Sequence, residues 1–516
     1  MDTKALRQKI LDLAIRGKLV PQDPNDEPAS VLLERIRAEK QQMVKDGKLK
    51  PKDIKNDTII FVGEDNLHYE KFQDGSVKCI EDEIPFEVPE GWAWCRFTSV
   101  TVNRDSERKP ISSANRTNVA KIYDYYGASG KIDKIDKFIF NEKLLLIGED
   151  GANLVTRSKP IAFFAEGQYW VNNHAHCIDS TDKLILEYLC LYINAISLEK
   201  YVTGSAQPKM TQDNMNSILI ALPPYEEQKR LEFQVDHILK TVSTIENEKE
   251  DIVNYIVSAK SKILDLAIRG KLVPQDPNDE PASVLLERIR AEKEELIKAG
   301  KIKRDKKESI IFRGEDNSYY EKVGKVIKNI DDEIPFTIPD SWKWCRLKAI
   351  CKKIVDGSHN PPKGLDFVTP YIMASSRNII ENTISDLSNV RYLNKENFIK
   401  EHSRTNVKIN DILLTTVATL GRSCIYKGKP ENLCFQRSVT VITSCILPTY
   451  LKLFFDAPYF QNFIVKSATG TAQKGFYLNQ LENVLICIPP LAEQDKISCG
   501  ISSVFYDLDL IEKSLN

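Results

Sequence analysis

Two proline pairs are the residues of this 516-residue chain that come closest to an enzymatic motif. An enzyme that methylates the exocyclic amine of a base carries Asn or Asp, two prolines and an aromatic residue, together with a glycine-rich loop for S-adenosylmethionine. Leu222-Pro223-Pro224-Tyr225 lacks the leading Asn or Asp, and Asn360-Pro361-Pro362-Lys363 lacks the aromatic residue. Neither string is accompanied by a G-x-G loop. We therefore expect the first pair to begin a helix and the second to form a turn.

Metal, phosphate and acyl-transfer chemistry are no better supported. His174 and His176 are two residues apart and would face one side of a strand, but neither a carboxylate nor a third ligand for zinc lies close in the sequence. We expect this pair to be structural or to contact nucleic acid. The chain contains neither a G-x-x-x-x-G-K-[ST] string nor a G-x-S-x-G string. The sequence thus predicts no catalytic residue, no metal site and no cofactor in this chain.

Loops rich in Arg, Lys, Asn and Gln remain as candidates for a nucleic-acid surface, because these side chains bind phosphates and the edges of bases. Arg422 and the pair Gln436-Arg437 lie in parts that differ between the two halves of the chain, where we expect specificity to reside. The same residue types are common on any solvated loop. The candidate contact residues are Arg104, Arg108, Arg116, Asn153, Arg157, Lys159, Asn172, Asn173, His174, Gln207 and Lys209 in the first half, and Ser358, His359, Lys363, Arg377, Asn378, Thr415, Thr416, Arg422, Gln436, Arg437, Gln473 and Lys474 in the second.

Charge is unevenly distributed between the regions that carry these loops. The whole chain has a net charge of −1. Residues 341–490 hold 19 Lys and Arg against 10 Asp and Glu, a net of +9, whereas residues 91–222 hold 15 against 14, a net of +1. A basic region within a neutral chain fits a local contact with DNA, and it also fits ordinary variation of a surface.

An internal repeat organises the elements that must position these loops. The string KILDLAIRGKLVPQDPNDEPASVLLERIRAEK occurs twice without a change, at residues 9–40 and 262–293. A second repeat joins GSAQPKMTQDNMNSILIALPPYEEQKRL, from Gly204, to GTAQKGFYLNQLENVLICIPPLAEQDKI, from Gly470. Because Gly-Ser/Thr-Ala-Gln occurs in both copies, we expect it to be structural or to contact a backbone. The regions between the repeated borders differ, which indicates a copied frame that carries two divergent modules.

A long helix is predicted after Pro223-Pro224. Apolar residues recur in alternating steps of four and three, as in a coiled coil, and Gly270 ends the pattern after about 43 residues. The C-terminus repeats the first part of this helix and the N-terminus repeats the last part, so a second helix is expected to be split between the two termini in a circular, pseudo-two-fold plan. The predicted seam residues are Leu231, Val235, Ile238, Val242, Ile245, Ile252, Ile256, Ile263 and Leu266.

The predicted fold class is α+β, with two mixed modules separated by long helices that form an antiparallel coiled coil. The VPQDPNDEPASVLLERIRAEK segments are expected to form a turn and a short helix, which either packs on its own domain or docks a partner. The expected divisions are an N-terminal helix at 1–20, a connecting segment at 21–90, a first module at 91–222, the central helix at 223–270, a second connecting segment at 271–340, a second module at 341–490 and a C-terminal helix at 491–516.

Cysteine use and hydropathy indicate the compartment. The eleven cysteines include no C-x-x-C pair, as is usual for reduced thiols in the cytoplasm. No stretch approaches the roughly 18 apolar residues that a membrane span needs, and the charged N-terminal helix does not resemble a signal peptide. We expect a cytoplasmic protein that does not associate with a membrane.

Taken in this order, the motifs resemble the specificity subunits of type I restriction-modification enzymes. The resemblance covers essentially the whole chain and rests on its two-module circular plan and on several strings. These are LPPYEEQKRL and IPPLAEQDKI at the module-to-helix junctions, EDGANLVTRSKPIAFFAEGQYWVNNHAHC from Glu149, VDGSHNPPKG from Val355 and DILLTTVATLGRSCIY from Asp411.

The resemblance implies that each module reads one half of a bipartite, asymmetric site in double-stranded DNA, and that the helices set the separation of the half-sites. It also implies two methyltransferase subunits, which bind S-adenosylmethionine and flip the target base, and two restriction subunits, which use ATP and magnesium. The chain itself would be non-catalytic and would bind no small-molecule substrate. Two alternatives stay open: a DNA amino-methyltransferase that acts alone, and a coiled-coil scaffold that binds only protein.

Overall fold

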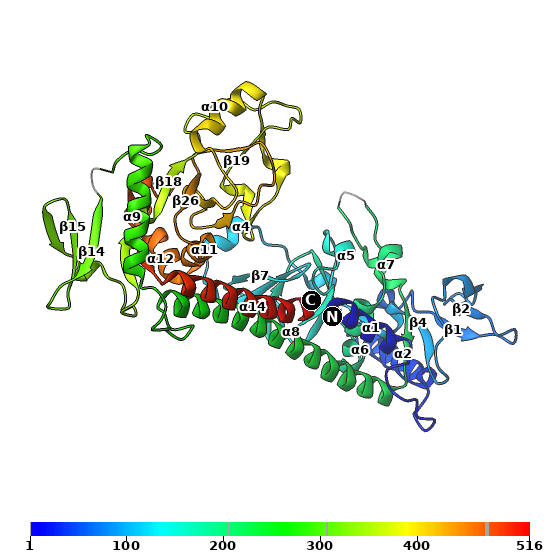
Figure 1. Ribbon diagram of the computed structural model, residues 1–516. Helices are drawn as coiled ribbons and strands as arrows, with labels where there is room; N and C mark the ends of the chain where they lie inside the picture. The colour runs from blue at the N-terminus through cyan, green and yellow to red at the C-terminus, as the bar shows by residue number, and fades with distance from the viewer. Residues whose placement is uncertain (1, 205–206, 306–307, 470–473, 516) are drawn as a thin grey trace. The chain divides into compact units, whose positions relative to one another are not determined.

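The computed structural model describes residues 2–204, 207–305, 308–469 and 474–515 (Figure 1). The chain divides into two compact units, Met1–Glu248 and Lys249–Asn516, and the division falls within the longest helix, α8 (Tyr225–Ile268). Both units contain helices and strands, so the predicted α+β class is confirmed in its mixed composition. Each unit is described by itself.

The first unit begins with α1 (Thr3–Ile15) and α2 (Ala29–Lys45), followed by an antiparallel three-stranded sheet. The first module follows, and it enters and leaves through a two-stranded stem in which β4 pairs with β13. Inside it lie two four-stranded sheets of order β10-β9-β12-β5 and β7-β6-β11-β8. The remaining elements are β1 (Ile59–Val62), β2 (His68–Lys71), β3 (Val77–Cys79), β4 (Ala93–Arg96), α3 (Phe97–Val100), β5 (Val102–Asn103), α4 (Ser113–Thr117), β6 (Tyr123–Gly127), β7 (Gly130–Ile135), β8 (Phe140–Asn141), β9 (Leu144–Gly148), α5 (Asn153–Thr156), β10 (Ala162–Ala165), β11 (Gln168–Val171), β12 (Ala175–Asp179), α6 (Lys183–Ala195), α7 (Gln212–Asn216) and β13 (Leu219–Leu222).

The second unit repeats this order from the end of α8 to α14 (Leu491–Leu515). Its module also begins and ends in a two-stranded stem, in which β17 pairs with β27. The module contains two sheets, of order β18-β26-β23-β24 and β22-β19-β25, and the hairpin β20-β21. Its other elements are α9 (Ala282–Lys298), β14 (Ser309–Arg313), β15 (Tyr319–Val323), β16 (Val326–Asn329), β17 (Lys343–Arg346), β18 (Cys351–Asp356), β19 (Ile372–Ala374), β20 (Ile379–Ile380), β21 (Thr383–Ile384), β22 (Arg391–Tyr392), α10 (Lys395–Thr405), β23 (Ile412–Thr415), β24 (Ser423–Ile425), β25 (Leu433–Phe435), β26 (Val439–Ser444), α11 (Pro448–Asp456), α12 (Pro458–Ser467), α13 (Leu478–Glu482) and β27 (Leu485–Ile488).

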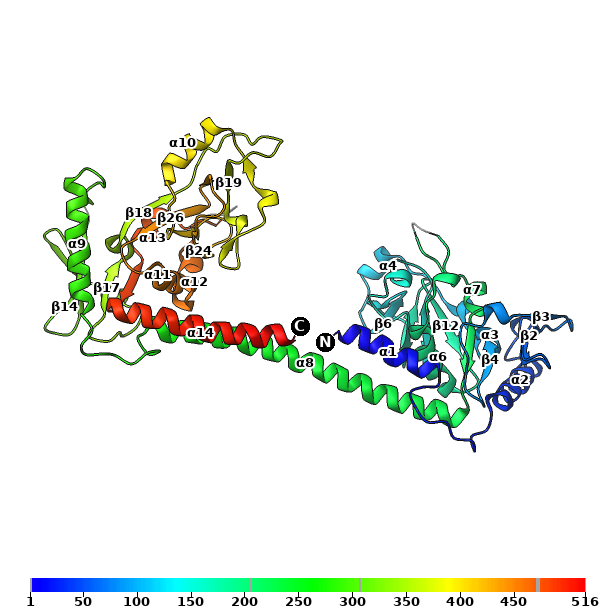
Figure 2. The ribbon, with the colours of Figure 1, turned by 45° about the vertical axis from the view of Figure 1, so that its right-hand side comes forward.

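Within each unit a second helix lies antiparallel to α8 (Figure 2). In the first unit, Arg7 of α1 forms a 2.7 Å ion pair with Glu246, while Gln22, after the end of α1, donates to Glu227 near the start of α8. In the second unit, Lys260 binds Asp509 at 2.5 Å near the end of α14, and Gln275 donates to Glu493 near its start. The chain order therefore reverses along each pair of helices.

The predicted seam is buried at the two ends of α8 and opens in its middle. Leu231 and Ile256 are buried, but Ile245 and Ile252 are each 39% exposed. In the first unit α1 forms an ion pair with Glu246 of α8, and in the second unit α14 forms ion pairs with Lys260 of α8. The predicted seam residues are therefore buried in part, and those in the middle of α8 are exposed.

A duplicated hydrogen-bonded junction joins each module to its long helix. Glu227 is 1% exposed and accepts hydrogen bonds from the Trp92 indole and from Gln22 at 2.9 Å each. Glu493 does the same with Trp342 at 2.8 Å and Gln275 at 2.5 Å. Burial raises the pKa of Glu227 and of Glu493 above the ordinary value, and these hydrogen bonds oppose that rise.

The three-stranded sheets are elements that the sequence analysis did not predict. The expected turn and short helix are present as α2 and α9, each preceded by a proline at its N-cap. Each is followed by a sheet, β1-β2-β3 or β14-β15-β16, that carries exposed apolar side chains. Asn66 and Gly75, with φ of 61° and 84°, form the hairpin turns of the first sheet, and such residues are the usual signal of a hairpin.

In each unit an arginine with a mostly buried side chain, 12% exposed for Arg96 and 11% for Arg346, holds the sheet to the stem of the module. Arg96 of β4 binds Glu70 at 2.6 Å and Glu83 at 2.8 Å, and Arg346 of β17 binds Glu321 at 2.6 Å and Glu333 at 2.7 Å. Both guanidinium groups also donate to a backbone carbonyl close to the other strand of the stem. The two arginines therefore connect three separate segments of each unit.

Two further expectations can be compared with the structure. All eleven cysteines lie in the described part of the chain, and none of them forms a disulfide. Among the described residues, no helix has both the length and the apolar character required to cross a bilayer.

Candidate nucleic-acid interface

The structure brings the candidate loops of the first module together. The backbone N–H of Glu149 donates to His174 at 2.9 Å, that of Met210 to Glu149 at 2.8 Å and that of Gly151 to Pro208 at 2.9 Å. The segments around 150, 174 and 209, which are far apart in the sequence, therefore form one surface at the ends of β9 and β12.

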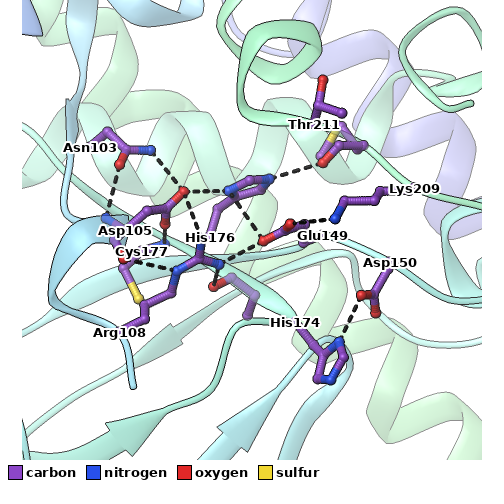
Figure 3. A network of polar contacts seen from close by, with 12 residues as sticks. Asn103, Asp105, Arg108, Glu149, Asp150, His174, His176, Cys177, Lys209 and Thr211 are labelled. Atoms are coloured by element: carbon purple, nitrogen blue, oxygen red, sulfur yellow. Dashed lines mark hydrogen bonds and ion pairs between the residues drawn. The ribbon is translucent and has the colours of Figure 1, made fainter. Parts of the chain in front are cut away.

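A polar network fixes the interior of this surface (Figure 3). His176 is 1% exposed, and its Nδ1 lies 2.6 Å from Asp105 and its Nε2 3.0 Å from the Met210 carbonyl. Arg108 binds Glu149 at 2.7 Å and Asp105 at 3.2 Å, and Lys209 binds Glu149 at 3.1 Å. Every cation of this network faces a carboxylate, so the network is internally neutralised and structural.

The carboxylates of the network are held in their ionised form. Burial raises the pKa of Asp105 most strongly, but the hydrogen bond and charge of His176 and the charge of Arg108 outweigh it and hold the pKa below the ordinary value. For Glu149 burial again opposes ionisation, and the hydrogen bond from Arg108 leads the contributions that lower the pKa. Both groups therefore stabilise the fold in their charged form.

We expect Asp105→Asn to lower the free energy of unfolding by about 2 kcal/mol at neutral pH, because it removes the charged acceptor of the buried His176 and one of the two carboxylates that Arg108 binds, while Glu149 still pairs with Arg108. Since the folded pKa lies below the unfolded pKa, the stabilisation is complete above about pH 5 and is lost as the pH falls through the folded value. Urea unfolding of both proteins at several pH values measures this, and the difference between them should shrink in acid. Glu166→Gln, at an exposed position of the same module, is the control. A pH-independent difference would contradict the assignment.

The other candidate arginines of the first module are also partnered within the protein. Arg104 binds Glu107, Glu142 and Asp179, Arg116 binds Asp133, and Arg157 donates to the carbonyls of Ile193 and Asn194. Asn153 caps the loop that ends at Lys159, at 3.0 Å from its backbone N–H. Of the remaining candidates, His174 lies 2.7 Å from Asp150, while Asn173, Lys159 and Gln207 are exposed.

The candidate loops of the second module converge in the same manner. Arg437 donates its backbone N–H to Ser358 at 2.9 Å, Thr416 to Ser438 at 3.0 Å and Ala418 to Lys474 at 3.2 Å. Gly357 permits this close approach, because a Cβ there would lie 2.2 Å from the Phe435 carbonyl oxygen.

Three arginines surround a cavity of about 480 Å³ in this surface. Arg377 lies on a 3-10 turn, Ser376–Asn378, Arg391 lies on β22, and Arg437 is the second residue after β25. Arg391 donates to the Pro362 carbonyl at 2.7 Å, and no carboxylate of the described residues lines the cavity. The second module therefore presents positive charge that is not neutralised at this cavity. The lining residues are Ser375, Ser376, Arg377, Asn389, Arg391, Val417, Ala418, Thr419, Gln436, Arg437 and Ser438.

Five candidate contact residues have buried side chains, so the expectation that they contact DNA is corrected. Asn378 is fully buried and donates to the Asp386 carbonyl at 2.9 Å, which fixes the turn that carries Arg377. Thr415 accepts a hydrogen bond from the backbone of Arg422 at 2.9 Å. These side chains shape the loops from within. The five are Asn172, Ser358, Asn378, Thr415 and Thr416.

The other described candidates of the second module include accessible residues, and the cavity arginine Arg391 was missed. Arg422, Lys363 and Lys474 are exposed, and His359 lies within hydrogen-bonding distance of Asp356, at 2.5 Å. Gln473 lies outside the described residues. Arg391 was not predicted, because the pairing of β22 with β19 brings it to the cavity, and no pattern in the neighbouring sequence predicts that pairing.

The histidine pair does not form a metal site. His176 points into the network, whereas His174 is exposed and faces Asp150 (Figure 3). In the described ranges no group of three or more His, Cys, Asp and Glu side chains is arranged to hold a metal ion.

Each of the two α+β modules carries one cluster of polar loops. A family model described as type I restriction modification DNA specificity domain matches residues 89–255 and 339–516. The chain therefore belongs to the family of type I restriction-modification DNA specificity proteins.

Individual relatives agree with this family. The chain is 29% identical to the type I restriction enzyme EcoEI specificity subunit of Escherichia coli, over 99% of this chain and 90% of the relative. It is 28% identical to the EcoAI specificity subunit of the same species, over 96% of this chain and 87% of the relative. The crystal structure of the HsdS subunit from Thermoanaerobacter tengcongensis aligns with a TM-score of 0.38 and 15% identity, over 84% of this chain and 94% of that chain.

Proposed function

We propose that the chain is the DNA-reading specificity subunit of a type I restriction-modification complex. Each module reads one half of a bipartite, asymmetric site in double-stranded DNA. The observation that carries the proposal is the pair of equivalent loop clusters, which have different side chains and charge, on a frame that the sequence repeats. A protein that recognised a single motif twice would need no such difference.

The helices form the frame that separates the half-sites. We propose that the helices build an antiparallel coiled coil in a circular plan. One helix of the pair is the continuous α8, and the other is split between α1 and α14. The antiparallel contacts inside each unit support this arrangement. A helix of 44 residues is roughly 65 Å long, which exceeds the roughly 34 Å between half-sites one helical turn apart.

Two methyltransferase subunits and two restriction subunits complete the complex, and they supply the sites for S-adenosylmethionine, ATP and magnesium. The duplicated surface of α2 and α9 supports two copies of one partner, because their sequences are identical over residues 29–40 and 282–293 while the modules diverge. The exposed apolar side chains of the neighbouring sheets, such as Val62 at 56% and Val326 at 68%, extend this surface. We place the complex in the bacterial cytoplasm.

Base-resolution sequencing of methylated DNA tests the proposal. In a host that carries the chain with its methyltransferase, we expect one motif with two specified blocks of different sequence around unspecified bases. The purified chain alone should neither bind S-adenosylmethionine in calorimetry nor methylate DNA. A single continuous motif, or methylation by the isolated chain, would contradict the proposal, and the second result would favour a methyltransferase that acts alone.

A further inference from the structure

One short loop occupies the same structural position in both modules. In the first module β11 pairs in parallel with β6, and in the second β25 pairs in parallel with β19. The next backbone N–H donates back across this pair in both: Asn172 to Tyr126 at 3.1 Å, and Gln436 to Ala374 at 2.9 Å.

The far end of the loop is equivalent as well. The carbonyl of His174 accepts from the backbone of Glu149 at 2.9 Å, and the carbonyl of Ser438 accepts from that of Thr416 at 3.0 Å. Both tripeptides therefore lie between the same two sheets, although the strands around them differ in sequence. Asn172-Asn173-His174 corresponds to Gln436-Arg437-Ser438.

The middle residue of each tripeptide is exposed, and its side chain is free. Among the described residues, neither Asn173 nor Arg437 has a side-chain hydrogen bond or ion pair, whereas the residue before each is partly or fully buried. A loop whose backbone is hydrogen-bonded at both ends therefore presents one unpartnered polar side chain at the same place in each module. The two side chains differ in hydrogen-bonding groups: the carboxamide of Asn173 has a donor and an acceptor, whereas the guanidinium of Arg437 has donors only.

The charge around the two side chains also differs between the modules. Arg437 lines the cavity with Arg377 and Arg391, and no carboxylate of the described residues lines that cavity. Arg437 also lines a smaller cavity with Asp356, whose carboxylate is already bound by Arg404 and His359. Such a site favours the two acceptors of guanine, O6 and N7, which a guanidinium binds in bidentate fashion. Near Asn173, the carboxylate of Asp150 lies 2.7 Å from His174. An acidic neighbour favours a base edge that carries an amino group, and Asn binds N6 and N7 of adenine in bidentate fashion.

We propose that Arg437 and Asn173 are equivalent specificity-determining residues, and that Arg437 reads a guanine in one half-site while Asn173 reads an adenine in the other. This inference rests on the proposed function and deepens it. Arg377 and Arg391 then bind the phosphates beside the guanine. Gln436 and Asn172 hold the loop rather than read a base.

The test is base-resolution sequencing of the methylated motif produced by the complete complex with single substitutions in this chain. Arg437→Ala should relax one position of one block, at which the parent requires guanine, with roughly tenfold or greater loss of discrimination there. Asn173→Ala should relax one adenine position of the other block. Lys429→Ala, at an exposed residue beyond the opposite end of β25, is the matched control and should leave both blocks unchanged.

The charge-retaining variant Arg437→Lys separates base reading from phosphate binding. It should relax the same guanine position, because an ammonium lacks the planar fork, and it also decides the matter if Arg437→Ala abolishes methylation. An unchanged motif with uniformly weaker methylation, or relaxation of a position other than guanine, would overturn the inference while the bipartite motif of the parent left the proposed function intact. Absence of a bipartite motif in the parent would instead overturn the proposed function.

Discussion

Insertion of one heptad into α8 after Thr244, with seven residues added ahead of Thr3 at the start of α1, is expected to widen the unspecified spacer by about three base pairs. Seven residues lengthen a helix by about 10 Å, and base pairs stack at about 3.4 Å. A whole heptad keeps the apolar positions in phase, so the pairing of the helices survives the change. The two specified blocks should stay as they are, because neither module is altered.

The double insertion should change the methylated sites almost completely. Sites with the original spacer should no longer be methylated, and sites with the longer spacer should become substrates. Sequencing of methylated DNA from cells with the altered complex reads the spacer directly. Seven residues inserted at Gly47, in an exposed turn with no atom within 4 Å of its Cβ position, serve as the control and should leave the spacer unchanged. A constant spacer after the double insertion would mean that the helices do not set the distance.

Replacement of the stem arginine, Arg96→Met, is expected to lower the free energy of unfolding by about 3–5 kcal/mol, because the buried Glu70, which is 3% exposed, would keep its charge without a charged partner. Burial opposes ionisation of Glu70 most strongly, and the hydrogen bonds from Arg96 and Thr58 and the charge of Arg96 nevertheless hold its pKa below the ordinary value. The stabilisation is therefore present above the unfolded pKa of Glu and is lost as the pH falls through the folded value.

Urea unfolding followed by tryptophan fluorescence measures this loss, and hydrogen exchange should locate it at β1-β2-β3 and the stem. Arg346→Met removes the equivalent arginine of the second unit and should have an effect of similar size. Lys78→Ala, which breaks an exposed ion pair with Glu83, should cost less than about 1 kcal/mol. If Arg96→Met and Lys78→Ala lowered the free energy of unfolding equally, the burial of Glu70 beside Arg96 would contribute nothing to stability.

The long helices could be predicted because their signals are local. Proline pairs mark their starts, Gly270 follows their end, and the apolar spacing between them is helical, so the expected helix of about 43 residues differs from the observed α8 by one residue. The burial of the seam was less predictable. Ile245 has the right spacing, yet its exposure depends on where another helix ends.

The three-stranded sheets were missed even though their turns have hairpin residues. All four side chains of β1, Ile59–Val62, are at least partly exposed, so no alternation of apolar and polar residues distinguishes a buried face. Prediction from periodicity needs one face in a core, and these strands form a small sheet whose apolar residues remain accessible.

The candidate contact residues were chosen by residue type, and their role in binding DNA stays a prediction. Some of the loops that carry them converge in each module, namely the segments around 150, 174 and 209 in the first and those around 358, 416, 437 and 474 in the second. Which cations are available depends on carboxylates far away in the sequence, such as Asp133 beside Arg116 and Glu142 beside Arg104. The sequence therefore suggested four exposed arginines in the first module, although each of them is already bound within the protein.

The two-stranded stems have a consequence for how new variants of this protein arise. Ala93 pairs with Leu222 and Arg96 with Leu219, so a module of well over a hundred residues leaves the frame and returns to it through neighbouring strands, about 4.8 Å apart. The second stem, Lys343 with Ile488, has the same form. The two ends of each module therefore lie side by side at one place on the frame. Under the proposed function, exchange of one such module between related genes would give the recipient a new half-site without any adjustment of its helices.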